Sequence, residues 1–280
     1  MLTLALCSRK VAERLAGVYV RVLDLVLPRL RRVAMRNLRL ALPELGEDEH
    51  RRIADGSFRS IARILVSLSR FPEMNKENIS EWIRYEGLEH FEEAKRRGKG
   101  VLFATAHLGN WELSAFAHAL MTEPMHVVVR PLDNPSIDGM VRKLRTMSGN
   151  QVIEKKDYAR GILRALSRNE AVGILIDQNM SLDEGIFVPF FGVAACVGTG
   201  FAKIAGHSGA AIIPGFALWS DEEGRYILKF HEPLLSSGNV EEDTRRIHAQ
   251  LESVIRGYPE QWLWMHRRWK TRPSGEPQIY

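Results

Sequence analysis

Cysteine is scarce in this sequence: Cys7 and Cys196 are the only two among 280 residues. They lie far apart and form no CxxC motif, so the sequence indicates neither a disulfide framework nor a cysteine-based zinc site. The default compartment for such a chain is a reducing one. Internal repeats, low-complexity tracts and convincing linkers are also lacking, which favours effectively one domain.

Long uncharged apolar runs are missing as well. Segments 1–7 and 15–27 are mostly apolar, but Arg9, Arg21 and Asp24 lie beside or within them. No stretch reaches the ~18 uncharged apolar residues that a membrane-spanning helix needs. A secretory signal is not expected either, because the basic residues follow the apolar run instead of preceding it.

The amino-terminal 40 residues are instead basic and amphipathic. They hold nine Lys or Arg against two acids, and their apolar residues recur at helical spacing: Val11, Leu15, Val18, Val22, Leu25 and Val26. This pattern predicts an amphipathic helix. Its apolar face could enter the interface of an anionic membrane, where each basic residue contributes about 1 kcal/mol. It could equally pack on the protein core and leave a solvated basic face.

The overall composition is that of an ordinary globular protein, with 45% hydrophobic and 26% charged residues. The formal net charge of +5 suggests an anionic partner such as nucleic acid, a membrane surface or an acidic protein. Helices are expected over 31–40 and 48–70. We therefore expect an amino-terminal, membrane-facing helical subdomain over 1–75 and an α/β domain over 76–280.

Strands and helices alternate in the second region. Short apolar runs at 101–106, 125–129 and 171–176 predict buried strands, and 136–148 predicts one of the helices between them. Such alternation favours an α/β fold with a largely parallel central sheet and helices on both faces.

A polar residue follows each of these three strands. His107 follows the first, Arg130 the second and Asp177 the third. In open α/β sheets the crevice beyond the carboxyl ends of the strands is the usual ligand site. Neighbouring strands would bring the three side chains to one cleft. Arg130 could instead satisfy loop carbonyls, and Asp177 could cap a turn.

His107 has an acid close by in the sequence. Asn110 is the expected N-cap of the next helix, and Glu112 lies in that helix's first turn. The turn at 108–109 lets the Glu112 carboxylate reach one imidazole nitrogen and fix the tautomer, which leaves the other nitrogen to take a proton from a hydroxyl. No serine or cysteine lies in 101–113, so direct attack by a substrate hydroxyl is the simpler interpretation. A buried histidine beside a helix-end acid is the alternative.

Two aromatic segments have open interpretations. The sequence FVPFFG at 187–192 could form a wall for an acyl chain or could be ordinary core. Segment 262–270 mixes tryptophan with basic residues, which suits a membrane interface, stacked nucleic-acid contacts, or a docked terminal element with a solvated cationic face.

The ordered motifs of the chain resemble those of the lipid A late acyltransferases. This family belongs to the lysophospholipid acyltransferase superfamily, which carries a His-x4-Asp/Glu box. The resemblance covers nearly the whole chain from residue 31 and rests on RRVAMRNLRLALPEL (31–45), AHLGNWE (106–112), RPLDNP (130–135), DQN (177–179), FVPFFG (187–192), GAAIIPGF (209–216) and PEQWLWMHRRWK (259–270).

The resemblance implies a glycerol-phosphate acyltransferase-like fold and a reaction. A fatty acyl chain would move from acyl carrier protein, or from acyl-CoA, to a hydroxyl of a lipid A precursor at the cytoplasmic face of the inner membrane. His107 would be the general base and Glu112 its orienting acid. Arg145, which composition alone would place on a solvated face, would steady the carbonyl oxygen or an acceptor phosphate. Asp177 would hold Arg145 or shape the acceptor site.

The resemblance also implies a set of substrate-binding residues and several absences. The candidate substrate-binding residues are Asn110, Arg130, Gln178, Phe187, Phe190 and Phe191. No metal, cofactor, covalent acyl-enzyme or nucleic-acid partner is expected. The amino-terminal apolar segment is shorter than is usual in this family, which favours peripheral attachment to the membrane.

Other functions stay open at this point. The acceptor could be another glycolipid or lysophospholipid, such as a phosphatidylinositol mannoside. A metallohydrolase could use His107, Glu112 and Asp177 as ligands. A non-enzymatic basic protein could bind a membrane or nucleic acid.

Overall fold

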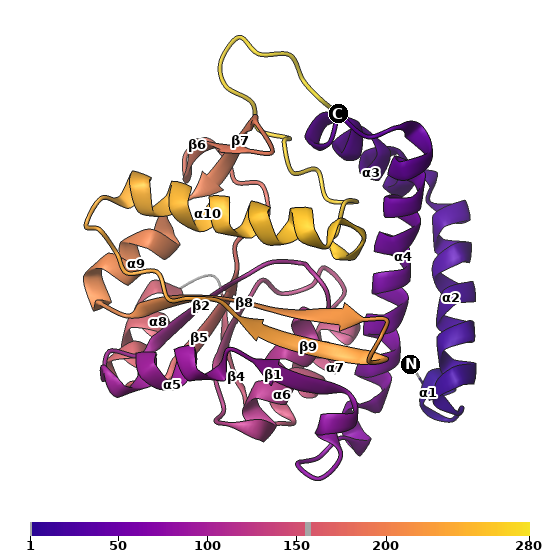
Figure 1. Ribbon diagram of the computed structural model, residues 1–280, viewed down its shortest axis with the longest axis horizontal. Helices are drawn as coiled ribbons and strands as arrows, with labels where there is room; N and C mark the ends of the chain where they lie inside the picture. Colours follow the sequence, from indigo (N-terminus) through magenta and orange to yellow (C-terminus); the bar gives the residue numbers. More distant parts are fainter. Residues whose placement is uncertain (1, 155–157) are drawn as a thin grey trace.

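The computed structural model describes residues 2–154 and 158–280 (Figure 1). Within them, a seven-stranded sheet has the order β1-β9-β8-β2-β5-β3-β4. Its neighbours pair in parallel except β8 and β9, which are antiparallel. The strands are β1 (Ile83–Glu86), β2 (Val101–Thr105), β3 (His126–Val129), β4 (Gln151–Glu154), β5 (Ala171–Leu175), β8 (Ala211–Ser220) and β9 (Arg225–Phe230). The predicted, largely parallel sheet is therefore confirmed, and β2, β5 and β3 are neighbours.

Helices cover both faces of this sheet (Figure 1). Successive residues of β2 point to opposite faces, as the pleat requires. Val101 and Phe103 join one apolar core with α5 (Leu88–Arg96) and α6 (Trp111–Met121). Leu102 and Ala104 join the other core with α8 (Tyr158–Ser167), α9 (Gly200–Ser208) and α10 (Val240–Gly257). Burial on both sides explains why these strands read as continuous apolar runs. Helix α7 (Pro135–Thr146) packs against α6 and β4.

Four helices form the amino-terminal region, and the two longest of them pack side by side (Figure 1). They are α1 (Leu2–Ala5), α2 (Arg9–Val26), α3 (Pro28–Ala41) and α4 (Glu47–Arg70), and the short turns η1 (Phe71–Glu73) and η2 (Ile79–Glu81) follow. Helix α2 buries Ala12, Ala16 and Val20 and packs against α4. Its other side exposes Leu25 and Val26, which are 75% and 68% exposed. None of the helices in the described part of the chain is long and apolar enough to cross a bilayer.

A separate hairpin was not predicted. Strands β6 (Gly185–Phe190) and β7 (Val193–Gly198) pair with each other and lie beside α10. Phe191 and Gly192 form the tight turn between them, and both have positive φ, 54° and 72°. The first four residues of the apolar FVPFFG motif therefore belong to β6, and the last two form the turn.

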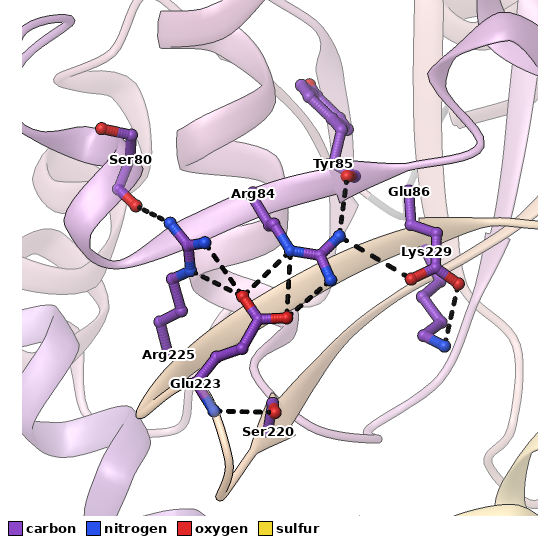
Figure 2. Close-up of polar contacts among 8 residues, drawn as sticks. All are labelled: Ser80, Arg84, Tyr85, Glu86, Ser220, Glu223, Arg225 and Lys229. Carbon is purple, nitrogen blue, oxygen red and sulfur yellow. Dashed lines mark hydrogen bonds and ion pairs between the residues drawn. The ribbon is translucent and has the colours of Figure 1, made fainter.

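Charged residues cover the edge of the sheet formed by β1 and β9 (Figure 2). Glu223 accepts hydrogen bonds from Arg84 Nη2 at 2.6 Å and from Arg225 Nε at 2.9 Å, and Lys229 lies 2.9 Å from Glu86. The hydrogen bonds from Arg84 and Arg225 lower the pKa of Glu223 to about 2. Such charges discourage an edge strand from pairing with another chain.

Candidate active site

His107 lies just beyond the carboxyl end of β2, in a turn pressed against β8. Gly109 in this turn has φ +63°, and a Cβ there would lie 1.9 Å from the carbonyl oxygen of Ala217. The backbone N–H of Asn110 donates to that same oxygen at 2.8 Å. Gly109 N–H donates to the carbonyl of Gln261, in the short helix η4 (Pro259–Gln261). Only glycine allows this close approach.

The carboxylate beside His107 belongs to Asp177. Thr105 of β2 pairs with Leu175 of β5, so the residues two positions further on face each other. His107 Nδ1 lies 2.9 Å from Asp177 Oδ1, and the backbone N–H of His107 donates to Oδ2 at 2.9 Å. The indole Nε1–H of Trp262 also donates to Oδ2, at 2.8 Å. Asp177 is 3% exposed.

These contacts fix the charge of Asp177 and the role of each imidazole nitrogen. Burial alone would raise the pKa of Asp177, but the charge of His107 and the hydrogen bonds from His107 and Trp262 outweigh it and hold that pKa well below its usual range. Because an ionised carboxylate only accepts hydrogen bonds, Nδ1 carries the hydrogen and Nε2 is the basic nitrogen. Gln178 Nε2 lies 3.5 Å from His107 Nε2, beyond normal hydrogen-bond length.

Glu112 and Arg145 form a separate ion pair. Arg145 Nε donates to one carboxylate oxygen at 2.8 Å and Nη2 to the other at 2.5 Å. The side chains are 10% and 19% exposed, so Arg145 is not on a solvated face. The expected contacts of Glu112 with His107 and of Asp177 with Arg145 are both wrong. The first turn of α6 faces α7, whereas the β2–β5 register sets Asp177 opposite His107.

An apolar pocket extends from this ion pair under α6. Trp111, whose ring lies edge-on to His107 with centroids 5.0 Å apart, lines the pocket together with Glu112 and Arg145. The pocket passes Thr105 at the end of β2 and reaches back to Phe103 and Met125. The remaining lining is mostly apolar and includes Phe116, Val127, Val129, Leu175 and Phe230.

The structure places the expected substrate-binding residues in different surroundings. Asn110 is the N-cap of α6, as predicted, since its side chain accepts from Leu113 N. It is fully buried and donates to Ser67 Oγ at 2.7 Å, so the expected contact with substrate is wrong. Arg130 is exposed and pairs with Asp133 at 3.3 Å. Gln178 lies beside His107.

The three phenylalanines expected to form an acyl wall do not line the apolar pocket. Phe190 and Phe191 are buried, and Phe191 stacks on Trp262 with centroids 6.1 Å apart. Phe187 is half-buried in β6. The ordinary-core interpretation is correct for Phe190 and Phe191, because the hairpin turns these rings toward the carboxyl-terminal tryptophans.

Sequence reasoning missed two residues of the site, Trp262 and Trp111. The spacing of neither tryptophan in the sequence indicates a role. The position of Asp177, by contrast, does indicate its partner. His107 and Asp177 each come two residues after the last residue of a parallel strand, and this equal offset could have paired them.

The same residues form no metal centre in the described ranges 2–154 and 158–280. No group of three or more His, Cys, Asp and Glu side chains there is arranged to hold an ion. His107 and Asp177 bind each other, and Glu112 is bound by Arg145. The structure therefore gives no support to the metallohydrolase alternative.

Comparisons with known proteins identify the family of this chain. The family model described as bacterial lipid A biosynthesis acyltransferase matches residues 1–271. A lipid A biosynthesis lauroyltransferase of Escherichia coli is 31% identical over 252 residues, which are 89% of this chain and 82% of that protein. A palmitoleoyltransferase of the same organism is 29% identical over 91% of this chain and 83% of its own. An acyltransferase of Haemophilus influenzae is 26% identical over 87% and 76%. The chain therefore belongs to the bacterial lipid A biosynthesis acyltransferases and is an O-acyltransferase.

Proposed function

We propose that this protein transfers a fatty acyl chain from a thioester donor to a hydroxyl of a lipid A precursor, with His107 as general base and Asp177 as its orienting acid. The observation that carries the proposal is the 2.9 Å contact between His107 Nδ1 and Asp177 Oδ1. It leaves Nε2 as the nitrogen that accepts a proton. The same arrangement of imidazole and carboxylate serves general-base catalysis in other enzymes.

The reaction follows from this arrangement. Nε2 of His107 takes the proton of the acceptor hydroxyl while the hydroxyl oxygen bonds to the thioester carbonyl carbon. The C–S bond then breaks. His107 gives its proton to the sulfur, and the donor leaves as a thiol. Asp177 stabilises the imidazolium formed in between. No covalent acyl-enzyme is required, because the acceptor oxygen attacks directly.

Arg145 is the candidate for stabilising the carbonyl oxygen. Its Nη1 forms no hydrogen bond with the residues that the structure describes, whereas Nε and Nη2 are fixed on Glu112. A guanidinium held in this way can donate to an oxygen that gains charge, without reorganising. Glu112 is then a positioning residue for Arg145. It does not act on the base.

The apolar pocket is the proposed site of the acyl chain. It begins at Trp111, next to His107, and passes along the face of β2 toward Phe103. A chain bound there has its carbonyl carbon near the imidazole and its methyl end toward Met125. The net charge of +5 supports an acidic donor protein, namely acyl carrier protein. The exposed apolar side of α2 supports peripheral attachment to the inner membrane at its cytoplasmic face.

The test compares two acids with a matched control. Asp177→Asn should lower kcat about 10³- to 10⁴-fold in acyl transfer to a lipid A precursor, because the amide no longer fixes the tautomer of His107. Glu170→Gln is the control, since Glu170 lies 2.8 Å from His126 Nε2 and forms a histidine–carboxylate pair away from the site. Its kcat should stay within about twofold of wild type.

Glu112→Gln separates the two possible orienting acids. It should impair the enzyme through Arg145 and lower kcat less than Asp177→Asn does. Thermal unfolding of each variant shows whether it is folded. A folded Asp177→Asn with wild-type kcat, or a Glu112→Gln with the larger loss, contradicts the role assigned to Asp177.

A further inference from the structure

A second cleft lies between the amino-terminal end of α3 and the carboxyl-terminal segment 262–270. We call it the α3 cleft; its lining is Leu27, Arg29, Leu30, Val33, Asn179, Met265, His266, Arg267 and Lys270. Asn37 of α3 joins the two walls, because its buried Nδ2 donates to the carbonyl oxygens of Trp264 and His266, each at 2.7 Å. The cleft is therefore built from fixed elements.

The α3 cleft carries positive charge that no carboxylate balances. Arg29, Arg267 and Lys270 line it, and no acid does. Within the part of the chain that the structure describes, none of these three side chains forms an ion pair or a hydrogen bond; Arg267 only contacts the Tyr280 ring, at 5.7 Å. By contrast, Arg31 in the neighbouring cleft between α2 and α4 is held by Asp24 and Asp55. Unbalanced cations in a cleft attract an anionic ligand.

The α3 cleft is lined by residues of the two segments that contact His107. Asn179, in its lining, comes two residues after Asp177 and donates its backbone N–H to His266 Nε2 at 3.1 Å. The backbone N–H of Leu263 donates to the carbonyl oxygen of His107 at 3.0 Å. Burial lowers the pKa of His266 to about 4, so its ring is a neutral wall of the cleft.

The α3 cleft and the acyl pocket lie on different faces of the sheet. Phe103 and Met125 of the acyl pocket belong to the core under α5 and α6, whereas Met265 of the cleft belongs to the opposite core. A reaction with two substrates needs a binding site for each of them near the same base. Leu27, at the end of the exposed apolar side of α2, also lines the cleft, which connects it to the proposed membrane face.

We propose that the α3 cleft binds a phosphate of the acceptor's headgroup through Arg267, Lys270 and Arg29. The inference rests on the proposed function, and it adds the acceptor's binding site and the charge that is recognised there. Arginine and lysine are the usual phosphate ligands of proteins. The phosphate of the donor's phosphopantetheine arm has the same chemistry. A donor whose acyl chain lies in the acyl pocket, however, binds on the other face of the sheet.

The test is the double variant Arg267→Ala/Lys270→Ala, with Arg97→Ala/Lys99→Ala as the matched control. The control removes the same two residue types and the same charge from the amino end of β2, the far end of the strand from His107. The cleft variant should raise the KM for a bis-phosphorylated lipid A precursor about tenfold or more. Its kcat and its KM for the acyl donor should stay within about twofold of wild type, as should every constant of the control.

A binding measurement separates this inference from the proposed reaction. His107→Ala protein, with and without the cleft substitutions, is titrated with the bis-phosphorylated precursor and with the same lipid after removal of its phosphates. Only the phosphorylated lipid should lose affinity on substitution, whether or not the wild type transfers acyl chains. A rise in the donor's KM alone, equal losses for both lipids, or a matching loss of binding to phosphatidylglycerol vesicles overturns the assignment.

Discussion

Gly109 fixes where the catalytic turn ends and α6 begins. Its positive φ and the nearby Ala217 oxygen leave no room for a side chain. Gly109→Ala should therefore unfold at a lower temperature than wild type and lose activity, because the turn must move and His107 moves with it. The strained backbone alone costs about 1–2 kcal/mol, and the clash adds to that.

Gly98→Ala is the control for this prediction. Gly98 also has positive φ, +68°, but a Cβ there meets nothing within 4 Å. It should show the cost of the backbone conformation alone, with normal kcat. Equal unfolding temperatures for the two variants would show that the close approach to β8 has no energetic consequence.

Single residues are also where sequence reasoning reached its limit. The sequence singles out His107 and Asp177 because both follow buried strands, but it pairs His107 with Glu112, whereas the structure pairs it with Asp177. Spacing along the chain favoured Glu112, five positions from His107, whereas the pairing of two parallel strands decided in favour of Asp177 at 70 positions. Strand order and register depend on contacts between residues far apart in the chain, and a single sequence does not predict them.

At the scale of elements, the sequence was a better guide. Apolar runs and helical spacing predicted the three central strands and helices α2 to α4 within a few residues, because both faces of the sheet are buried and Pro28, Pro43 and Pro72 lie at the helix ends. The sequence does not predict the β6–β7 hairpin. Its turn contains a phenylalanine at φ 54° and lacks the Asn-Gly or Asp-Gly pair that marks a tight hairpin. The resemblance to the acyltransferases is confirmed by the family model.

Helix α2 supports one prediction about the membrane. Leu25→Glu/Val26→Glu should weaken binding to phosphatidylglycerol vesicles about tenfold or more, because burying each aliphatic side chain in the interface contributes about 1.5–3 kcal/mol. Both side chains are exposed, so the fold should be kept. Co-sedimentation with vesicles measures the change.

Leu182→Glu/Leu235→Glu is the control for the membrane prediction. These leucines are 60% and 48% exposed and lie outside the amino-terminal helices. Their substitution adds the same charge and should leave vesicle binding unchanged. If both double variants lose binding to the same degree, the cause is net charge, and α2 is not the contact.

For the whole molecule, histidines with lowered pKa values make stability depend on pH, and His118 and His266 are two of them. Burial lowers the pKa of His118 to about 3 and that of His266 to about 4. The hydrogen bonds agree, because His118 Nδ1 lies 2.6 Å from the hydroxyl of Tyr85, and His266 Nε2 accepts from Asn179 N–H. Protonation of His266 Nε2 would break its bond, because the Asn179 N–H only donates; at His118 the Tyr85 hydroxyl would have to change from donor to acceptor.

The sign of the effect follows from proton uptake. Below the ordinary histidine pKa of about 6.5, the unfolded chain binds protons that the folded His118 and His266 do not, so the free energy of unfolding should fall as the pH drops from 6.5 toward 4. Each histidine contributes a slope of about 1.4 kcal/mol per pH unit in this window. Urea unfolding of wild type and His118→Gln between pH 7 and pH 4.5 measures the slopes. The variant should be less stable at pH 7 yet lose less on acidification, because it lacks one proton-binding group; parallel slopes would mean that His118 takes up its proton over the same pH range in the folded and the unfolded chain.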